Sequence, residues 1–305
     1  MTYFLKRIPS ALFTIWLVAT SVFFLVKLAG GEEILGEGRV DPMVIEEISR
    51  EWKLDRPLHE QYWYHMSKLL VLDSVESRKQ RFMTLRDVLG AYLPASLRLA
   101  WRALAIALAI GMPIGVLSAL HHNRFIDNAG RFLSLLGVSV PSFILASLVI
   151  FVFVRQLNWF PASEWMEGYW RMWVPAACLA AFPFAAIMRL TRASMLSVFS
   201  EDYMRTATAK GVPAFRVVVR HGLRNALVPV VTYLGPVLAG LLTGSLVIEK
   251  IFSINGIGRI FIESVSNRDM PLIMGLTVFY CMLLVGANLL VDALYPILDP
   301  RIRHS

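Results

Sequence analysis

Residues able to do chemistry are present in this chain, but their spacing fits no catalytic or metal site. The six histidines do not stand at metal-ligand spacing with carboxylates, and no nucleophile is paired with a base. The phosphate-binding pattern GxxxxGK followed by Ser or Thr does not occur. Cys178 and Cys281 both fall inside apolar segments, which argues against a disulfide framework or a metal site. We therefore expect no catalytic residue, no metal and no cofactor bound by this chain.

The most informative spacing belongs to a polar, basic stretch at 201–229 that separates two long apolar runs. It reads EDYMRTATAKGVPAFRVVVRHGLRNALVP. Lys210, Gly211 and Pro213 follow four small residues, and a glycine just past a helical run with a proline soon after it is a helix stop. The pattern predicts a short helix and a sharp turn in which Gly211 adopts a left-handed backbone. A second amphipathic run then leads back into an apolar segment.

A short helix of this composition favours docking into a groove on another protein. Its small side chains permit close approach, and its basic residues can pair with acidic groups of a partner or with lipid phosphates. An amphipathic helix lying on lipid is the alternative, but it does not explain the Lys-Gly stop. The predicted docking residues are Tyr203, Arg205, Thr206, Ala207, Thr208, Ala209, Lys210 and Gly211.

The elements that hold this stretch are apolar helices. The chain of 305 residues is 56% hydrophobic and 17% charged, with a mean hydropathy of +0.58, which is typical of an all-α polytopic membrane protein. A run of about 20 apolar residues spans a hydrocarbon core of ~30 Å. The first run is longer than the apolar part of a signal peptide and is interpreted as an uncleaved helix. Six spans are predicted, at 8–30, 93–120, 130–154, 172–195, 226–248 and 271–297.

Charge predicts the orientation of these six spans. The N-terminus, the 121–131 loop, the 189–225 region and the tail together carry 13 Lys and Arg against four acids, whereas the long 31–92 segment carries 9 against 12. The positive-inside rule therefore places both termini in the cytoplasm. The net charge of +8 reflects this topology. Nucleic acid is not an expected partner, because the basic residues are dispersed among helix ends.

Four parts of the chain follow from this topology. Apolar and polar runs alternate, and the helical periodicity of the outer segment predicts two helices in it, at 43–54 and 59–72. The predicted parts are a first transmembrane helix at 1–30, an extracytoplasmic helical loop at 31–92, a five-helix transmembrane core at 93–300 with the docking loop at 201–225, and a cytoplasmic tail at 301–305.

Four residues in or near the spans are candidates for a translocation path. Arg98 and Arg102 come at the outer end of the second span, where they either snorkel to the interface or contact cargo. Ser139 and Pro141 fall where the third span is rich in small residues and is expected to kink. We expect a solute to pass near these positions if they face the centre of the assembly.

Other polar and small residues in the spans are expected to be structural. Gly111, Pro113 and Gly115 in the second span serve close helix packing, a kink or a gating hinge. Glu249 is expected to cap its helix or pair locally, and Asp292 to pair with a neighbouring arginine, whereas a proton-coupled carrier usually buries acids at mid-membrane. The chain also lacks an obvious internal repeat, which counts against a self-sufficient secondary carrier.

Several motifs, in order and correctly spaced relative to the spans, resemble the permease family for dipeptides, oligopeptides and nickel. Departures lie on the outer face, where GGEE at 30–33 replaces a Pro-Gly-Asp-Pro turn and Asn255 stands where proline is typical. The docking stretch keeps the family pattern. The matching motifs are LDRPL at 54–58, LPASLRLA at 93–100, RLTRASML at 189–196, DYMRTATAKG at 202–211, RHGLRNALVPVVTYLG at 220–235, NRDMP at 267–271 and LDPRIR at 298–303.

The resemblance implies the type I fold of ATP-binding-cassette importers and the first-permease role in a complex of a bacterial or archaeal inner membrane. It implies as partners a second homologous permease, one or two ATPase subunits that carry ATP and Mg, an extracytoplasmic substrate-binding protein and membrane lipid. The docking residues then form the coupling helix that meets the ATPase. Peptides are the expected cargo, with nickel or metal chelates, opines and small glycans as alternatives. An ion-coupled secondary carrier is the alternative from another class.

Overall fold

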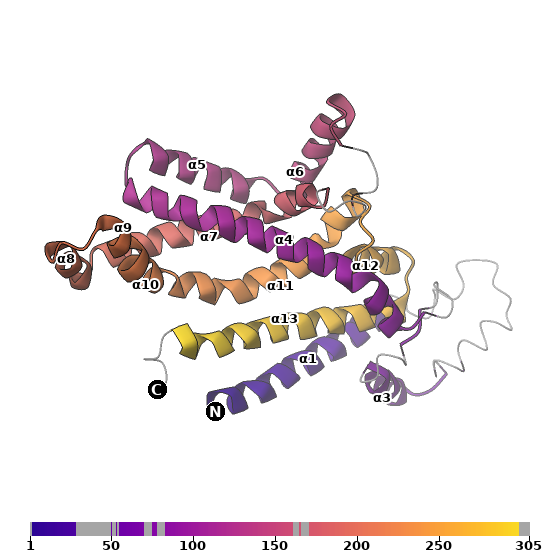
Figure 1. Cartoon of the computed structure of the whole chain (residues 1–305). Helices are drawn as coiled ribbons and strands as arrows, with labels where there is room; N and C mark the ends of the chain where they lie inside the picture. The colour runs from indigo at the N-terminus through magenta and orange to yellow at the C-terminus, as the bar shows by residue number, and fades with distance from the viewer. Residues whose placement is uncertain are drawn as a thin grey trace. The chain divides into compact units, whose positions relative to one another are not determined.

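The computed structural model describes residues 2–28, 50, 53, 55–69, 75–77, 83–160, 165 and 171–298, which are almost entirely helical (Figure 1). The chain forms two compact units. The first comprises Met1–Pro94 and Arg259–Val285, and the second comprises Ala95–Gly258 and Gly286–Ser305. The tail at 301–305 and most of the predicted helix at 43–54 lie outside the described residues.

Five helices within the described ranges are long and apolar enough to cross a membrane. Large apolar side chains are exposed along them, as expected of helices that face lipid. Each corresponds to one of the predicted spans, with ends that differ by up to eight residues. They are α1 (Thr2–Leu28), α4 (Leu85–Leu120), α7 (Trp173–Phe199), α11 (Val228–Ile251) and α13 (Met270–Leu298).

Helix α4 begins at Leu85, earlier than the predicted start at 93. Thr84 and Asp87 cap its first turn reciprocally. The Thr84 backbone N–H and hydroxyl donate to the Asp87 carboxylate at 2.9 and 2.8 Å, and the Asp87 N–H donates to the Thr84 hydroxyl at 3.3 Å. This capping box satisfies donors that a helix start otherwise leaves unpaired. The Thr-Leu-Arg-Asp sequence at 84–87 is a capping pattern that predicts this start, but the span was predicted from hydropathy alone.

The predicted third span at 130–154 is broken. Helix α5 (Phe125–Ser139) and the helical run from Ser142 to Gln156, which begins as α6 (Ser142–Val149), meet at an angle of 97°. Pro141 causes the break, because it has no N–H and forces the preceding Val140 out of the helical region, to φ −96° and ψ 113°. The kink was predicted, but its size was not. The count of six spans holds when this bent pair is taken as one span.

Two further helices lie wholly or mostly in the first unit. Helix α3 (Leu58–Leu69) matches the prediction at 59–72, and the Tyr62 hydroxyl shares a 2.9 Å hydrogen bond with Thr20 of α1. Helix α12 (Ile257–Ser266) precedes α13 and was not predicted. The Ser77 hydroxyl donates to the Asp269 carboxylate at 2.6 Å in this unit.

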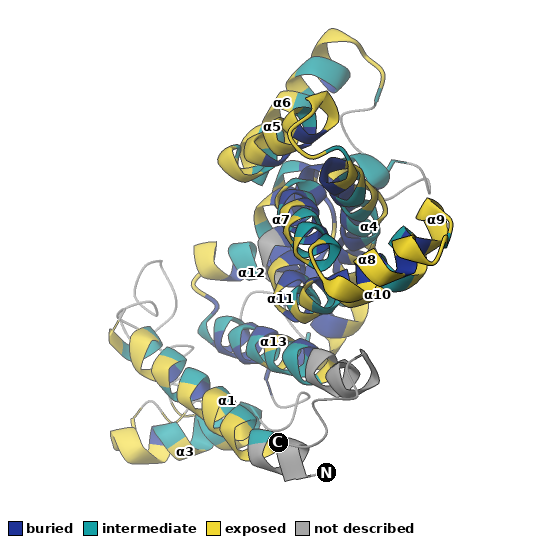
Figure 2. Ribbon diagram, turned by 90° about the vertical axis from the view of Figure 1, so that its left-hand side faces the viewer, coloured by how far each residue is buried: buried dark blue, intermediate teal, exposed yellow. Residues whose placement is uncertain are grey.

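The second unit is built around α7, which carries eleven buried residues and contributes part of the interior that Figure 2 shows in dark blue. Glycines of its neighbours permit close contact with it. A Cβ on Gly115 of α4 would come within 2.7 Å of the Met188 carbonyl, and one on Gly137 of α5 within 2.7 Å of the Ala181 carbonyl. Small residues allow this backbone approach in membranes. The contacts favour the packing interpretation of Gly115 over the hinge.

The stretch between α7 and α11 forms a separate group of short helices. In Figure 1 these lie at the end of α7 and α11 that is opposite α6. The group comprises α8 (Asp202–Ala209), α9 (Ala214–Arg216), a π-helical segment at Val217–Leu223 and α10 (Arg224–Ala226).

Candidate functional site

Helix α8 ends in a Schellman motif at the predicted stop. Gly211 has φ +71°, in the left-handed region that favours glycine. Its N–H donates to the Thr208 carbonyl at 3.0 Å, and the Val212 N–H donates to the Ala207 carbonyl at 3.3 Å. These two bonds satisfy carbonyls that the helix end would leave unpaired. The prediction of a left-handed Gly211 is confirmed.

One face of α8 is buried against the rest of its own group. Met204 and Ala207, one turn apart, pack with Val217, and Phe199 and Val212 cover the cluster. Ala207, at 9% exposure, therefore faces inward and not toward a partner. Its small side chain lets α8 lie close to the segment after the turn. The other predicted docking residues lie on α8 or at its end and are exposed.

The outward face of α8 is polar without strong internal bonding. The hydroxyls of Thr206 and Thr208 each donate back to their own helix at 3.0 Å. Arg205 lies 3.8 Å from Asp202, with both side chains well exposed. Such an exposed pair contributes little to stability, so the guanidinium is available for a partner.

Two aromatic side chains flank this surface. Tyr203 accepts a 2.8 Å hydrogen bond from the Asn225 side chain, which ties the start of α8 to α10. Phe215 follows the turn and is 79% exposed, a residue that the sequence interpretation passed over. Exposed aromatic side chains are of a type that is enriched in protein interfaces. A hollow of about 690 Å³ adjoins α8, and residues of α8, of the segment at 212–218 and of the ends of α4 and α7 line it.

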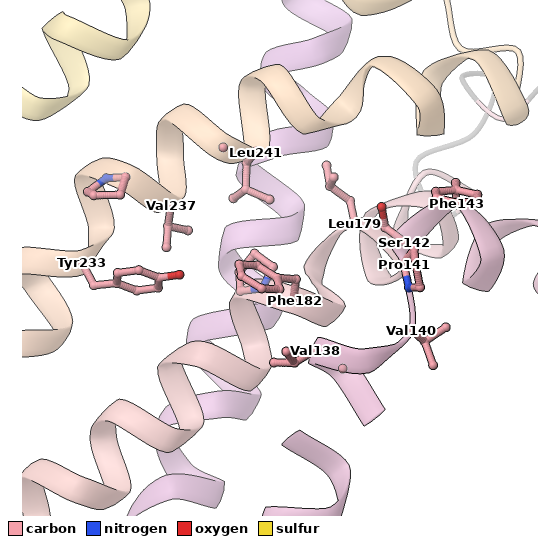
Figure 3. Close-up of a pocket in the computed structure, with 14 residues that line it drawn as sticks. Val138, Val140, Pro141, Ser142, Phe143, Leu179, Phe182, Tyr233, Val237 and Leu241 are labelled. Carbon is pink, nitrogen blue, oxygen red and sulfur yellow. The ribbon is translucent and has the colours of Figure 1, made fainter. Parts of the chain in front are cut away.

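A second hollow, of about 340 Å³, lies at the break between α5 and α6 (Figure 3). Its walls come from the break, from α7 and from α11, and in Figure 3 Val237 and Tyr233 of α11 face Phe182 of α7. Pro141 is among the lining residues, whereas Ser139 is not. The walls are mostly apolar. Of the candidate path residues, only Pro141 lines this hollow.

The two arginines of the candidate path lie elsewhere in α4. Arg102 donates to the Arg98 carbonyl at 3.1 Å and to the Met172 sulfur at 3.5 Å. Its guanidinium also lies 5.7 Å from the centre of the Trp173 ring, within cation-π range. Arg98 is exposed. Neither arginine lines either of the two hollows described here.

Glu249 is fully buried at the end of α11 and pairs locally, as predicted. Its carboxylate accepts a local hydrogen bond from Ser245 at 2.7 Å and a distant one from Ser96 of α4, also at 2.7 Å, which the sequence did not predict. The Ser96 hydroxyl in turn accepts from the Ile257 N–H at 2.9 Å. A Cβ on Gly256 would clash with the same carboxylate. The predicted pairing of Asp292 lies outside the side chains that the structure describes.

Long apolar helices with a short, polar helix held rigidly between two of them define a class of protein. Chains of this kind are multi-pass membrane proteins.

Comparison with known proteins identifies the family within this class. Residues 111–304 match the family described as binding-protein-dependent transport system inner membrane component. The chain belongs to this family and is a permease subunit of the inner membrane.

Named relatives match along the whole length. A dipeptide transport system permease protein of Bacillus subtilis (strain 168) is 42% identical over 301 residues, which are 99% of this chain and 97% of the relative. Oligopeptide transport system permease proteins of Haemophilus influenzae and Salmonella typhimurium are 37% and 36% identical over 305 residues, all of both chains. The predicted family, helical membrane fold and transport role are confirmed.

Proposed function

We propose that this chain is one of two homologous permeases in an ATP-driven importer of peptides. One or two ATPase subunits supply the work with ATP and Mg, and an extracytoplasmic binding protein delivers the cargo. The names of the relatives support peptide as the cargo. The chain itself takes part through its helices, since its sequence lacks the phosphate-binding motif GxxxxGK followed by Ser or Thr.

The observation that carries this proposal is the geometry of α8. It is a two-turn helix with a buried inner face, an exposed outer face and a fixed stop at Gly211. We infer that the outer face, with Tyr203, Arg205, Thr206, Ala209 and Lys210, docks in a groove of the ATPase. Thr208 and Phe215 border the contact.

The cargo path is proposed to include the hollow at the α5–α6 break. Its apolar walls and Pro141 fit a passage that binds weakly and without strict side-chain selection. Residues 31–92 are proposed to stay outside the membrane, where the binding protein would meet them.

Ala209→Asp tests the docking role. Ala209 is exposed in the last turn of α8. A carboxylate there adds bulk to the contact and opposes the helix dipole. Ala209→Ser keeps the residue small and is the matched control. The tagged wild-type chain and both variants are purified from the native membrane in mild detergent, and co-purifying proteins are quantified by mass spectrometry.

We expect wild type and Ala209→Ser to recover a second six-span permease and a P-loop ATPase. Ala209→Asp is expected to keep the second permease and lose most of the ATPase. Equal ATPase recovery from all three preparations would contradict the docking role. A wild-type chain recovered alone, moving solute under an ion gradient, would contradict the importer itself.

A further inference from the structure

A buried ion pair joins two helices of the second unit near the group of short helices at 202–226. The Asp127 carboxylate in the first turn of α5 is fully buried. Arg192 of α7 donates to both of its oxygens, from Nε at 2.5 Å and from Nη2 at 2.7 Å. The Asn123 N–H donates a further bond at 2.9 Å. The sequence interpretation missed the pair, because its partners are 65 residues apart.

Other groups around this carboxylate are weaker neighbours. His122 approaches it at 3.5 Å and Arg131 at 3.8 Å, and both side chains are half exposed. The Nη2 of Arg192 also lies 3.1 Å from the His122 ring. The two-pronged bond from Arg192 is therefore the contact that fixes the orientation of Asp127.

The backbones near the pair are packed tightly as well. A Cβ on Gly115 of α4 would come within 3.2 Å of the Arg192 nitrogen, and one on Gly130 of α5 within 2.6 Å of the Met188 side chain. Met195, one turn beyond Arg192, belongs to a buried cluster with Ala119 and Ala226. The cytoplasmic ends of α4, α5 and α7 are thus held together at this level.

The pair also stands between the two hollows along the chain. Helix α7 continues about two turns past Arg192 to Phe199, which covers the buried face of α8. Helix α5 runs from Asp127 to the break at Pro141, which forms a wall of the apolar hollow. A displacement of α8 that tilts α7 would reach this wall through Asp127 and α5.

We propose that Asp127 and Arg192 are positioning residues that transmit movement from the docking helix to the broken span. This rests on the proposed function, since it assumes that α8 meets an ATPase. A buried ion pair is often no more stabilising than an apolar pair of similar size. The role of this one is directional, because two short bonds to a single carboxylate prevent α5 from sliding along α7.

The test replaces both charges together. Asp127→Leu combined with Arg192→Met removes the pair without leaving either of its charges buried and unpaired, and we expect the chain to keep its fold. Arg131→Met is the control, since it removes the weaker neighbour of the same carboxylate. Complexes purified from the native membrane are placed in proteoliposomes with the binding protein. ATP hydrolysis and uptake of radiolabelled alanine dipeptide and pentapeptide are measured on the same samples.

We expect the double variant to keep its ATPase subunits and its hydrolysis rate. Its uptake per ATP is expected to fall about fivefold or more, the lower range of typical coupling between sites, while Arg131→Met behaves as wild type. Arg192→Lys, which keeps the charge and loses the two-pronged bond, is expected to fall between them.

Unchanged uptake per ATP in the double variant, with ATPase present, would overturn the positioning role alone. Loss of assembly in the double variant together with full coupling in Arg192→Lys would overturn it too, since a purely structural role predicts that result. A wild-type preparation without ATPase would overturn the proposed function and this inference with it.

Discussion

The way in which helix α8 ends depends on Gly211. Its left-handed backbone allows two hydrogen bonds to close the end of α8. No atom lies within 4 Å of where a Cβ would be. A side chain at this position therefore has room, and the effect of a substitution comes from the backbone alone.

We predict that Gly211→Val weakens ATPase binding and that Gly211→Asn largely preserves it. A β-branched residue in the left-handed region costs about 1–2 kcal/mol, whereas asparagine tolerates that region. Co-purification of the ATPase with each variant is the measurement. Equal recovery with valine and asparagine would show that the turn geometry does not matter for docking.

Residue types in sequence predict local features better than distant ones. The stop at Gly211 depends on five neighbouring residues and was predicted in detail. The inward orientation of Ala207 depends on Val217, which comes after the turn. The Asp127–Arg192 pair depends on how α5 packs on α7, which no local pattern contains. Asp127 therefore appeared in the sequence only as one acid among basic residues.

At the scale of the element, close contact between α4 and α7 is the feature that most restricts substitution. A Cβ on Gly115 would lie 2.7 Å from the Met188 carbonyl oxygen and 2.8 Å from the Thr191 side chain, closer than van der Waals contact allows. A Cβ on Gly90, in the same helix, would meet no atom of another element within 4 Å. The two glycines therefore differ in role although they are one residue type in one helix.

We predict that Gly115→Leu destabilises the protein by about 1–3 kcal/mol or more, the range for overpacked cores. Gly90→Leu, the matched change at an open position, is expected to leave stability unchanged or to raise it, because leucine favours helix over glycine. Thermal unfolding in detergent measures both. A common melting temperature for the two variants would be inconsistent with close α4–α7 packing.

The presence and approximate position of the long helices were predicted, because apolar length decides them. The exact start of α4 and the size of the bend at Pro141 were not. Helix α4 gains its first turns from a capping box, and the span at 130–154 turns by 97° because proline and its neighbour act together. Hydropathy averages over such local signals, so it gives the number of spans more reliably than their shape.

At the scale of the whole molecule, the predicted membrane fold is confirmed, while the function of each surface rests on the proposals above. The hollow at the α5–α6 break is the described space that a solute would use under those proposals. Its location could not be predicted, because helix rotation is not visible in a sequence. Of four candidate path residues, one lines it.

We predict that Val237→Trp blocks uptake. Val237 is buried and lines the hollow of about 340 Å³, which an indole ring in its place would narrow. Val247→Trp, an exposed position on the same helix, is the control. Uptake near background for Val237→Trp, with normal ATPase recovery and normal uptake for Val247→Trp, is the expected result. Full uptake by both variants would place the path elsewhere.

Because α8 begins and ends at defined residues, its length and the direction of its outer face are defined as well. Eight residues at 1.5 Å rise give a helix of about 12 Å, bounded by Glu201 at one end and the left-handed Gly211 at the other. Each residue added between these ends would turn the outer face by about 100° relative to the buried one. The number of residues from 202 to 209 thus sets the angle at which the chain presents Thr206 and Ala209.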